Sequence, residues 1–342
     1  MKMHRFLQIV PALATGFALF SPTAASAAVT YEWVEVGNPG NAADSSTGYG
    51  AVADTYRIGK YEVTNAQYTE FLNTVDPTGT NPNGIYNTGM GSDARGGIAF
   101  NAGAADGAKY TVKANMDNKP VNYVSWYDAA RFANWMNNGQ GAGDTETGAY
   151  TLTGNTGLPT RNTNSSIWLP SENEWYKAAY HDPVNAGADG SGTPDYWLYP
   201  TQSDSEPTVA TASILGDISN PGTNVANHNF GADWNGQDGN VTTVGSAGAG
   251  SASRYGTFDQ GGNVWEWNEA IISSSRGFRG GSWYNTTTLS SFMQSYDRFY
   301  GTPAAEGNNL GFRLASVPEP SSVLLVGLAG VALVTRRRRP TL

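Results

Sequence analysis

The stretch Gly262-Asn263-Val264-Trp265-Glu266-Trp267 decides how this sequence folds. It places one carboxylate between two tryptophans, and two blocks of similar character follow it, Arg279-Gly280-Gly281-Ser282-Trp283 and Asn309-Leu310-Gly311-Phe312-Arg313. Large aromatic residues at such positions usually pack in a core. We therefore expect a core that contains Trp265, Trp267, Trp283 and Phe312. Because buried arginines need partners, we expect Arg279 and Arg313 to form ion pairs with acids at its edge.

Three earlier blocks predict short helices: Ile58-Gly59-Lys60-Tyr61-Glu62-Val63-Thr64-Asn65, Pro120-Val121-Asn122-Tyr123-Val124-Ser125-Trp126 and Leu169-Pro170-Ser171-Glu172-Asn173-Glu174-Trp175. Thr64 and Ser125 are N-cap residues that precede apolar positions at helical spacing. Ser171 and Glu174 form a capping box. We expect His181 to end the third helix, where a cation favours the helix dipole. Strand-like pieces are found at Tyr56–Gly59, Trp168–Leu169 and Phe312–Ala315.

These six blocks, in this order, resemble the formylglycine-generating enzyme / sulfatase-modifying factor family. The resemblance implies an α+β fold, a variant of the C-type lectin fold with little regular secondary structure and long loops. Such loops are typical of this composition, because 42 glycines favour turns over regular elements. We expect one domain over residues 28–316.

Both ends of the chain are expected to direct its export. Residues 1–27 form a predicted signal peptide, with Lys2 and Arg5 before an apolar stretch and Ala25-Ser26-Ala27 as the cleavage site. Residues 317–342 combine Pro318-Glu319-Pro320, an apolar run and four arginines. They resemble the PEP-CTERM sorting signal of exopolysaccharide-producing Gram-negative bacteria.

The sorting signal implies transient retention in the inner membrane through a C-terminal transmembrane helix. Cleavage by an exosortase-type processing enzyme then releases the protein to the cell surface or the medium. A permanent C-terminal anchor is the alternative interpretation. The Arg cluster is expected to stay cytoplasmic under the positive-inside rule.

The charge of the chain excludes some partners. Without the two ends, 28 acidic residues face 14 basic ones. Nucleic acid and anionic membrane surfaces need a cationic surface, so neither is an expected partner.

The chain contains no cysteine. In catalytic members of the resembled family, two cysteines after the Gly-Gly-Ser block bind copper, and their positions fall on Asn285 and Ser290. Neither residue replaces a thiolate, so formylglycine generation by that mechanism is excluded. Related enzymes bind iron through several histidines, whereas only His181 and His228 remain outside the signal peptide. We expect no copper or iron site and no catalytic residue.

Calcium is the cofactor that the resemblance implies. One site would use Asp259, the carbonyls of Gly262 and Val264, and Glu266. A second would use Asn227, His228, Asp238 and Asn240. These oxygen donors suit a hard dication. The alternatives are that Glu266 caps backbone amides inside the core, and that Asp238 begins a simple turn.

Two interpretations of function follow. The favoured one is an exported, non-catalytic binding or structural module, stabilised by calcium, at the surface of a biofilm-forming bacterium. Its ligand would be a surface glycan or a peptide, with Tyr296, Arg298 and Tyr300 as groove residues. The alternative is an enzyme with non-thiol chemistry on the same scaffold, a metal-dependent oxidase or hydrolase.

Overall fold

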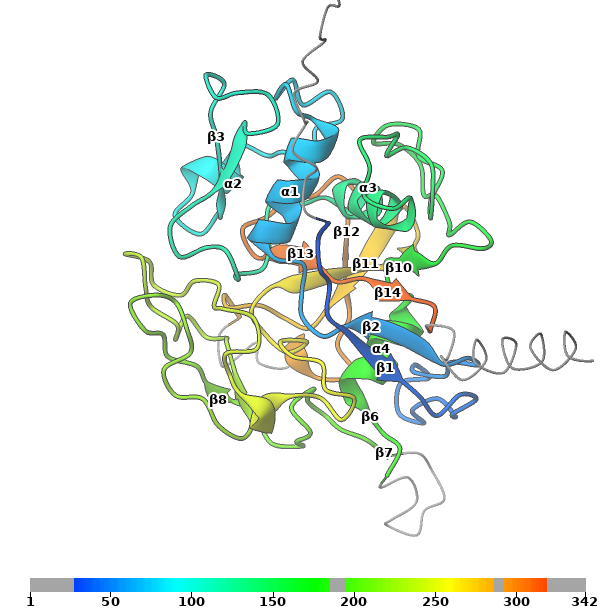
Figure 1. Cartoon of the computed structure of the whole chain (residues 1–342). Helices are drawn as coiled ribbons and strands as arrows, with labels where there is room; N and C mark the ends of the chain where they lie inside the picture. The colour runs from blue at the N-terminus through cyan, green and yellow to red at the C-terminus, as the bar shows by residue number, and fades with distance from the viewer. Residues whose placement is uncertain (1–27, 185–194, 286–291, 319–342) are drawn as a thin grey trace, which may run out of the picture.

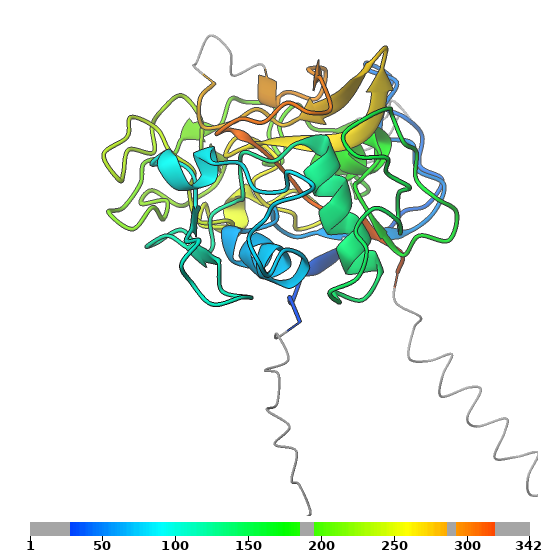
Figure 2. The same cartoon turned by 90° about the horizontal axis from the view of Figure 1, so that it is seen from above.

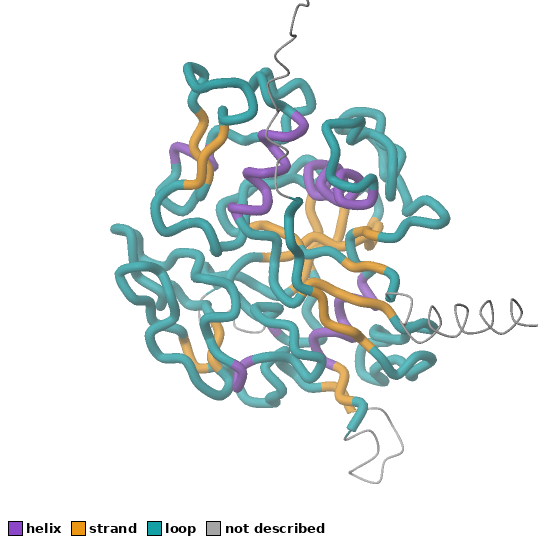
Figure 3. Tube along the Cα trace, in the orientation of Figure 1, coloured by secondary structure: helices purple, strands orange, loops and turns teal. Residues whose placement is uncertain are grey.

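The computed structural model describes residues 28–184, 195–285 and 292–318. Figures 1 and 3 show short helices and strands joined by long loops. The helical elements are α1 (Asn65–Val75), α2 (Gly89–Ser92), α3 (Trp126–Asn137), α4 (Glu172–Tyr180) and the 3-10 turn η1 (Ala249–Ser251). The first strands are β1 (Trp33–Val36), β2 (Tyr56–Gly59), β3 (Ile98–Phe100), β4 (Tyr110–Val112), β5 (Ile167–Trp168), β6 (His181–Asp182) and β7 (Asp195–Tyr196). The others are β8 (Thr208–Val209), β9 (Val225–Ala226), β10 (Trp265–Ile272), β11 (Ser275–Arg279), β12 (Phe299–Gly301), β13 (Leu310–Phe312) and β14 (Ala315–Ser316).

Two four-stranded sheets form the centre of the molecule. One has the strand order β1-β2-β14-β5, and the other has the order β12-β11-β10-β13. Strand β10 is antiparallel to β11 and parallel to β13, with Trp265, Glu266 and Trp267 opposite Leu310, Gly311 and Phe312. The block with the two tryptophans therefore lies in the interior of its sheet.

The C-terminal block joins the two sheets. We predicted one strand over Phe312–Ala315, and this was wrong: the chain leaves β13 at Phe312 and enters β14, in the other sheet, at Ala315. Arg313 and Leu314 lie between the strands. Their position brings Arg313 within reach of both sheets.

The three longer helices begin where the sequence predicted. Thr64, Ser125 and Ser171 are their N-caps, and each forms a reciprocal capping box with the third residue of its helix. The helices α1 and α3 lie together on one side of the sheet that contains β10 (Figures 1 and 2). Capping fixes each helix start, so the apolar face turns toward the core.

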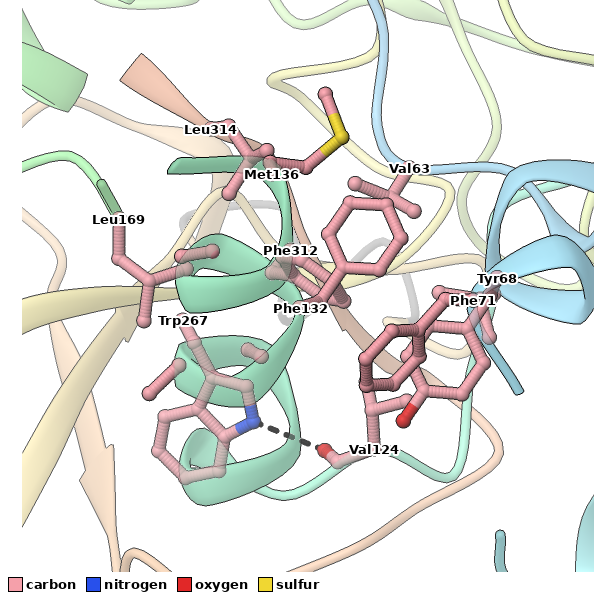
Figure 4. Close-up of a cluster of buried hydrophobic side chains, with 14 of the residues drawn as sticks. Val63, Tyr68, Phe71, Val124, Phe132, Met136, Leu169, Trp267, Phe312 and Leu314 are labelled. Carbon is pink, nitrogen blue, oxygen red and sulfur yellow. Dashed lines mark hydrogen bonds between the residues drawn. The ribbon is translucent and has the colours of Figure 1, made fainter. Parts of the chain in front are cut away.

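Aromatic rings fill the space between helices and sheets (Figure 4). The centre of the Phe132 ring lies 5.4 Å from the centre of the Phe71 ring and 5.5 Å from that of the Phe312 ring. The Trp267 indole donates a hydrogen bond of 3.0 Å to the carbonyl of Val124, which closes the loop before α3 onto β10. The expected burial of Trp265, Trp267, Trp283 and Phe312 is confirmed.

The predicted signal peptide and C-terminal transmembrane helix lie outside the described residues. Within the part of the chain that the structure describes, no helix has the length and apolar character needed to span a bilayer.

Gly262 sets how closely two loops approach. Its φ is +86°, and a Cβ built on it would lie 2.3 Å from the carbonyl oxygen of Asn227. Replacing it by alanine therefore adds an overlap with backbone to the cost of a positive φ. We expect Gly262→Ala to lower the free energy of unfolding by at least ~3 kcal/mol in urea titrations.

Gly256 is a matched control, because it has the same φ of +86° but its built Cβ would meet an atom only at 3.9 Å. Gly256→Ala should cost about 1–2 kcal/mol. Equal losses in the two variants would show that the contact with Asn227 does not constrain the fold.

Candidate functional site

A buried ion pair joins two of the blocks quoted from the sequence, those of Glu266 and Arg313. The Arg313 guanidinium donates to both carboxylate oxygens of Glu266, each at 2.6 Å, and both side chains are fully buried. The Trp175 indole donates a third hydrogen bond, of 2.7 Å, to the same carboxylate. The expected ion pair of Arg313 is confirmed, and both carboxylate oxygens of Glu266 accept hydrogen bonds.

Arg313 also binds the backbone around this pair. It donates to the carbonyls of Gly59 (2.9 Å) and Phe258 (2.8 Å). Gly59 ends β2, and Phe258 precedes the loop that leads into β10. The guanidinium thus connects both sheets with that loop.

The loop before β10 has an unusual backbone. Asp259, Gly262 and Asn263 all have positive φ, at 60°, 86° and 57°. The Asp259 carboxylate accepts from the amide of Gly245 at 2.6 Å. Burial raises the pKa of Asp259 to about 6, although the hydrogen bond from Gly245 acts to lower it. Glu266 is paired with Arg313, and the calcium set of Asp259, Gly262, Val264 and Glu266 stays a prediction.

The second predicted calcium set is only partly assembled. The Asn227 side chain donates to the carbonyl of Asn240 at 2.8 Å, so these two residues lie together in the interior. The Asn227 amide oxygen is buried and has no hydrogen-bond partner among the described residues. His228 pairs through Nε2 with the carbonyl of Pro207 at 3.0 Å. Asp238 is exposed. Its carbonyl accepts from Arg95.

Over the described ranges, no group of three or more His, Cys, Asp or Glu side chains is arranged to hold a metal ion. A site built from amide oxygens and backbone carbonyls is a different arrangement. The unpartnered oxygen of Asn227 is the kind of donor that such a site needs.

Asn285 is the residue that we expected at the first cysteine position of the resembled family. Its amide oxygen accepts from the Ser282 amide at 2.6 Å and from the Ser282 hydroxyl at 3.1 Å. It therefore closes the turn after the Gly-Gly-Ser block, and the side chain is buried. Ser290, the second position, lies outside the described residues.

An apolar pocket of about 270 Å³ adjoins Asn285. Its walls are aromatic and aliphatic side chains together with two asparagines: Trp265, Phe278, Phe292, Phe299, Leu310, Asn285 and Asn309. The rings of Phe292 and Phe299 meet at 4.5 Å in an edge-to-face contact. Apolar walls with few polar groups are typical of small-molecule sites.

The three predicted groove residues do not line this pocket. Side chains alternate along a strand, so Tyr300 in β12 lies on the opposite face from Phe299, and it is exposed. Arg298 donates to Glu172 at 2.8 Å. Tyr296 is exposed.

Two acids were not identified from the sequence: Glu172, which pairs with two arginines, and Glu62, which lies near Asp259 and Glu266. Glu172 accepts from both Arg279 and Arg298, each at 2.8 Å, which confirms the expected ion pair of Arg279. Glu62 lies fully buried near Asp259 and Glu266. Both acids belong to the quoted blocks. Their positions close to the N-caps Thr64 and Ser171 were the sequence feature that could have identified them.

His181 was expected to act as a cation at a helix end. It is indeed the C-cap of α4. However, burial and, to a smaller extent, the nearby Lys177 ammonium lower its pKa to about 4. The imidazole is therefore neutral at pH 7, and its Nδ1 pairs with the Tyr255 hydroxyl at 2.8 Å.

Comparison with protein families gives two matches. The model of the sulfatase-modifying factor enzyme 1-like domain matches residues 34–317. That of the PEP-CTERM protein-sorting motif matches residues 316–339. No curated protein matches the chain.

Several solved structures are similar to this chain. Treponema denticola variable protein 1 has 16% identity and a TM-score of 0.45, over 86% of this chain and 98% of that one. CarF has 19% identity and a TM-score of 0.46, over 85% and 99%. PvdO from Pseudomonas aeruginosa has 17% identity and a TM-score of 0.39, over 80% and 83%. The short helices and the mixed sheets are those of the α+β fold that the sequence predicted, and the family match over residues 34–317 agrees with it.

Proposed function

Because this chain belongs to the sulfatase-modifying factor family and carries a PEP-CTERM sorting motif, we propose that it is an exported, non-catalytic binding module, stabilised by calcium. The sorting motif marks an exported, surface-directed protein that exosortase-type machinery processes. The finer proposal is that it stays in the inner membrane until this cleavage and then serves a biofilm-forming cell at its surface.

The role of Asn285 carries the non-catalytic part of the proposal. Where the family's chemistry needs a thiolate, this chain has an amide that holds the turn at Ser282 through two hydrogen bonds. A carboxamide is neither a nucleophile nor a ligand for a soft metal. The scaffold is kept, while this position supports structure.

The pocket beside Asn285 supports a binding function. Aromatic rings offer flat apolar surfaces, and Asn285 and Asn309 line the same pocket. A sugar has apolar C–H faces and a rim of hydroxyls, so it matches rings flanked by amides. We propose a neutral glycan as the ligand, with a peptide as the alternative that the binding test separates.

Phe299→Leu should weaken glycan binding by about tenfold or more, because it removes a ring from the pocket wall and keeps most of the apolar packing. Isothermal titration with neutral cello-, xylo- and chito-oligosaccharides measures the effect. Tyr300→Leu is the matched control on the opposite face of β12 and should bind as the parent protein does.

Two results would contradict this site. One is equal weakening by both substitutions, and the other is binding of peptides but of none of these oligosaccharides. Circular dichroism of each variant checks that the fold is kept.

Calcium is proposed at Asn227, with the neighbouring carbonyl of His228 and with Asn240 and Asp238 from the facing loop. The support is the buried Asn227 oxygen, which has no partner among the described side chains and backbone groups. A cation there would satisfy this oxygen, since a buried acceptor without a partner costs stability.

Calcium at a hundredfold excess over its dissociation constant should stabilise the protein by ~2.7 kcal/mol relative to EGTA, as measured by thermal unfolding. Asn227→Asp adds a charge to the donor set. We expect it to enlarge the calcium effect and to lower stability in EGTA, where the new carboxylate is buried and unpaired.

Asp259→Asn is the matched variant in the other predicted set and should leave the calcium effect unchanged. Loss of the effect in this variant alone would move the ion to Asp259. No stabilisation of the parent protein by calcium would contradict the proposed cofactor.

A further inference from the structure

A second cavity, of about 480 Å³, lies away from the aromatic pocket and shares no residue with it. It is enclosed by the segment before β1, by the residues that start α1, and by two loops. Its lining residues are Thr30, Tyr31, Glu32, Tyr61, Glu62, Thr64, Ala66, Gln67, Asn118, Thr243 and Val244. Its volume lies within the range of small-molecule sites.

Glu62 is the distinctive residue in this wall. Its side chain is fully buried, and one carboxylate oxygen accepts from the Asn263 amide at 3.2 Å. The other oxygen, Oε2, has no partner in the part of the chain that the structure describes. Burying a carboxylate with an unsatisfied oxygen is costly, so such a group in a cavity wall indicates a missing cation or donor.

The surroundings of Glu62 are short of positive charge. The carboxylates of Asp259 and Glu266 and the guanidinium of Arg313 are the charges that act on it most strongly. Arg313 is engaged by both oxygens of Glu266. Burial and the negative charge of Asp259 hold the pKa of Glu62 well above its usual range. A bound cation would remove both the charge imbalance and the unsatisfied oxygen.

The other charged group on the wall is already paired. Glu32 is exposed and forms an ion pair with Lys60 at 3.1 Å. The Lys60 ammonium also lies 5.1 Å from the centre of the Tyr61 ring. Glu62 is therefore the carboxylate in this cavity that needs a partner from outside.

We propose that this cavity binds a small polyhydroxylated molecule that carries a protonated amine, of the amino-sugar class, with its ammonium group against Glu62. The cavity is much larger than a metal ion, and the described side chains include no cluster of three metal-binding groups. The exposed Asn118 can pair with ligand hydroxyls, and the ring of Tyr61 gives a flat apolar wall.

The test is isothermal titration of the full chain with D-glucosamine under conditions where its amine is protonated. N-acetyl-D-glucosamine and D-glucose serve as uncharged counterparts. We expect glucosamine to bind. The two neutral sugars should bind more weakly by about tenfold or more, because they cannot form the charge-assisted hydrogen bond.

Glu62→Gln keeps the size and the acceptor for Asn263 but removes the charge. It should weaken glucosamine binding by about tenfold or more. It should also keep or raise the unfolding midpoint without ligand, since a buried unpaired acid is gone. Glu32→Gln, at the exposed part of the same wall, should bind glucosamine nearly as the parent does.

Three outcomes would overturn the proposal: no glucosamine binding to the parent chain, equal binding to Glu62→Gln, or equal binding of N-acetylglucosamine. A calcium-binding signal that Glu62→Gln abolishes, without glucosamine binding, would also overturn it and make Glu62 a metal ligand. These results are independent of the proposed glycan pocket, which Phe299→Leu tests.

Discussion

The buried pair between Glu266 and Arg313 is the interaction on which the rest of the structure depends. Glu266 lies in β10, and Arg313 lies where the chain passes from one central sheet to the other. The same guanidinium binds carbonyls from β2 and from the loop before β10. A buried ion pair is stable only when its remaining hydrogen-bonding capacity is satisfied. Here Trp175 from α4 completes the set, so one charged contact orients two sheets, a helix and a loop.

This frame separates the fold from the family's known chemistry. The aromatic residues, glycines and arginines that define the blocks all serve packing, turns or ion pairs. By contrast, Asn285, the residue that we expected at the family's first cysteine position, closes a turn through its amide. In the proposed function, cavities rather than a nucleophile carry the activity, and the two candidate cavities differ in chemistry. One is aromatic and neutral, and the other contains an unpaired buried acid.

Much of the fold could be predicted from the sequence. The helix starts at Thr64, Ser125 and Ser171 follow from local hydrogen bonding, which a short sequence window contains in full. Strand boundaries near Phe312 were missed because the partner strands come from distant segments, and only tertiary structure shows that two sheets share this stretch. The protonation of His181 was misjudged for a related reason. Its neutral state comes from burial and from Lys177, and neither effect is visible in the pattern around a helix end.

The candidate sites were less predictable than the fold. Glu62 lies in a quoted block, yet its importance arises from the lack of a partner for one oxygen, which is a property of the packed interior. The calcium set with Glu266 was drawn from family resemblance and stays a prediction, whereas the pairing of this carboxylate with Arg313 is a property of the packed interior. A sequence motif specifies which residues are present, and the spatial competition among acids for one guanidinium decides which of them remains available.

The central claim is that Glu266 holds the fold through Arg313, and a double-mutant cycle tests it most directly. The free energies of unfolding of Glu266→Gln, Arg313→Met and the double variant would be measured in EGTA and in calcium. We expect each single change to cost about 3–5 kcal/mol and the two to be strongly coupled, by ~2–3 kcal/mol, in both conditions. Additive losses within ~0.5 kcal/mol, or a cost of Glu266→Gln that appears only in calcium, would contradict the claim.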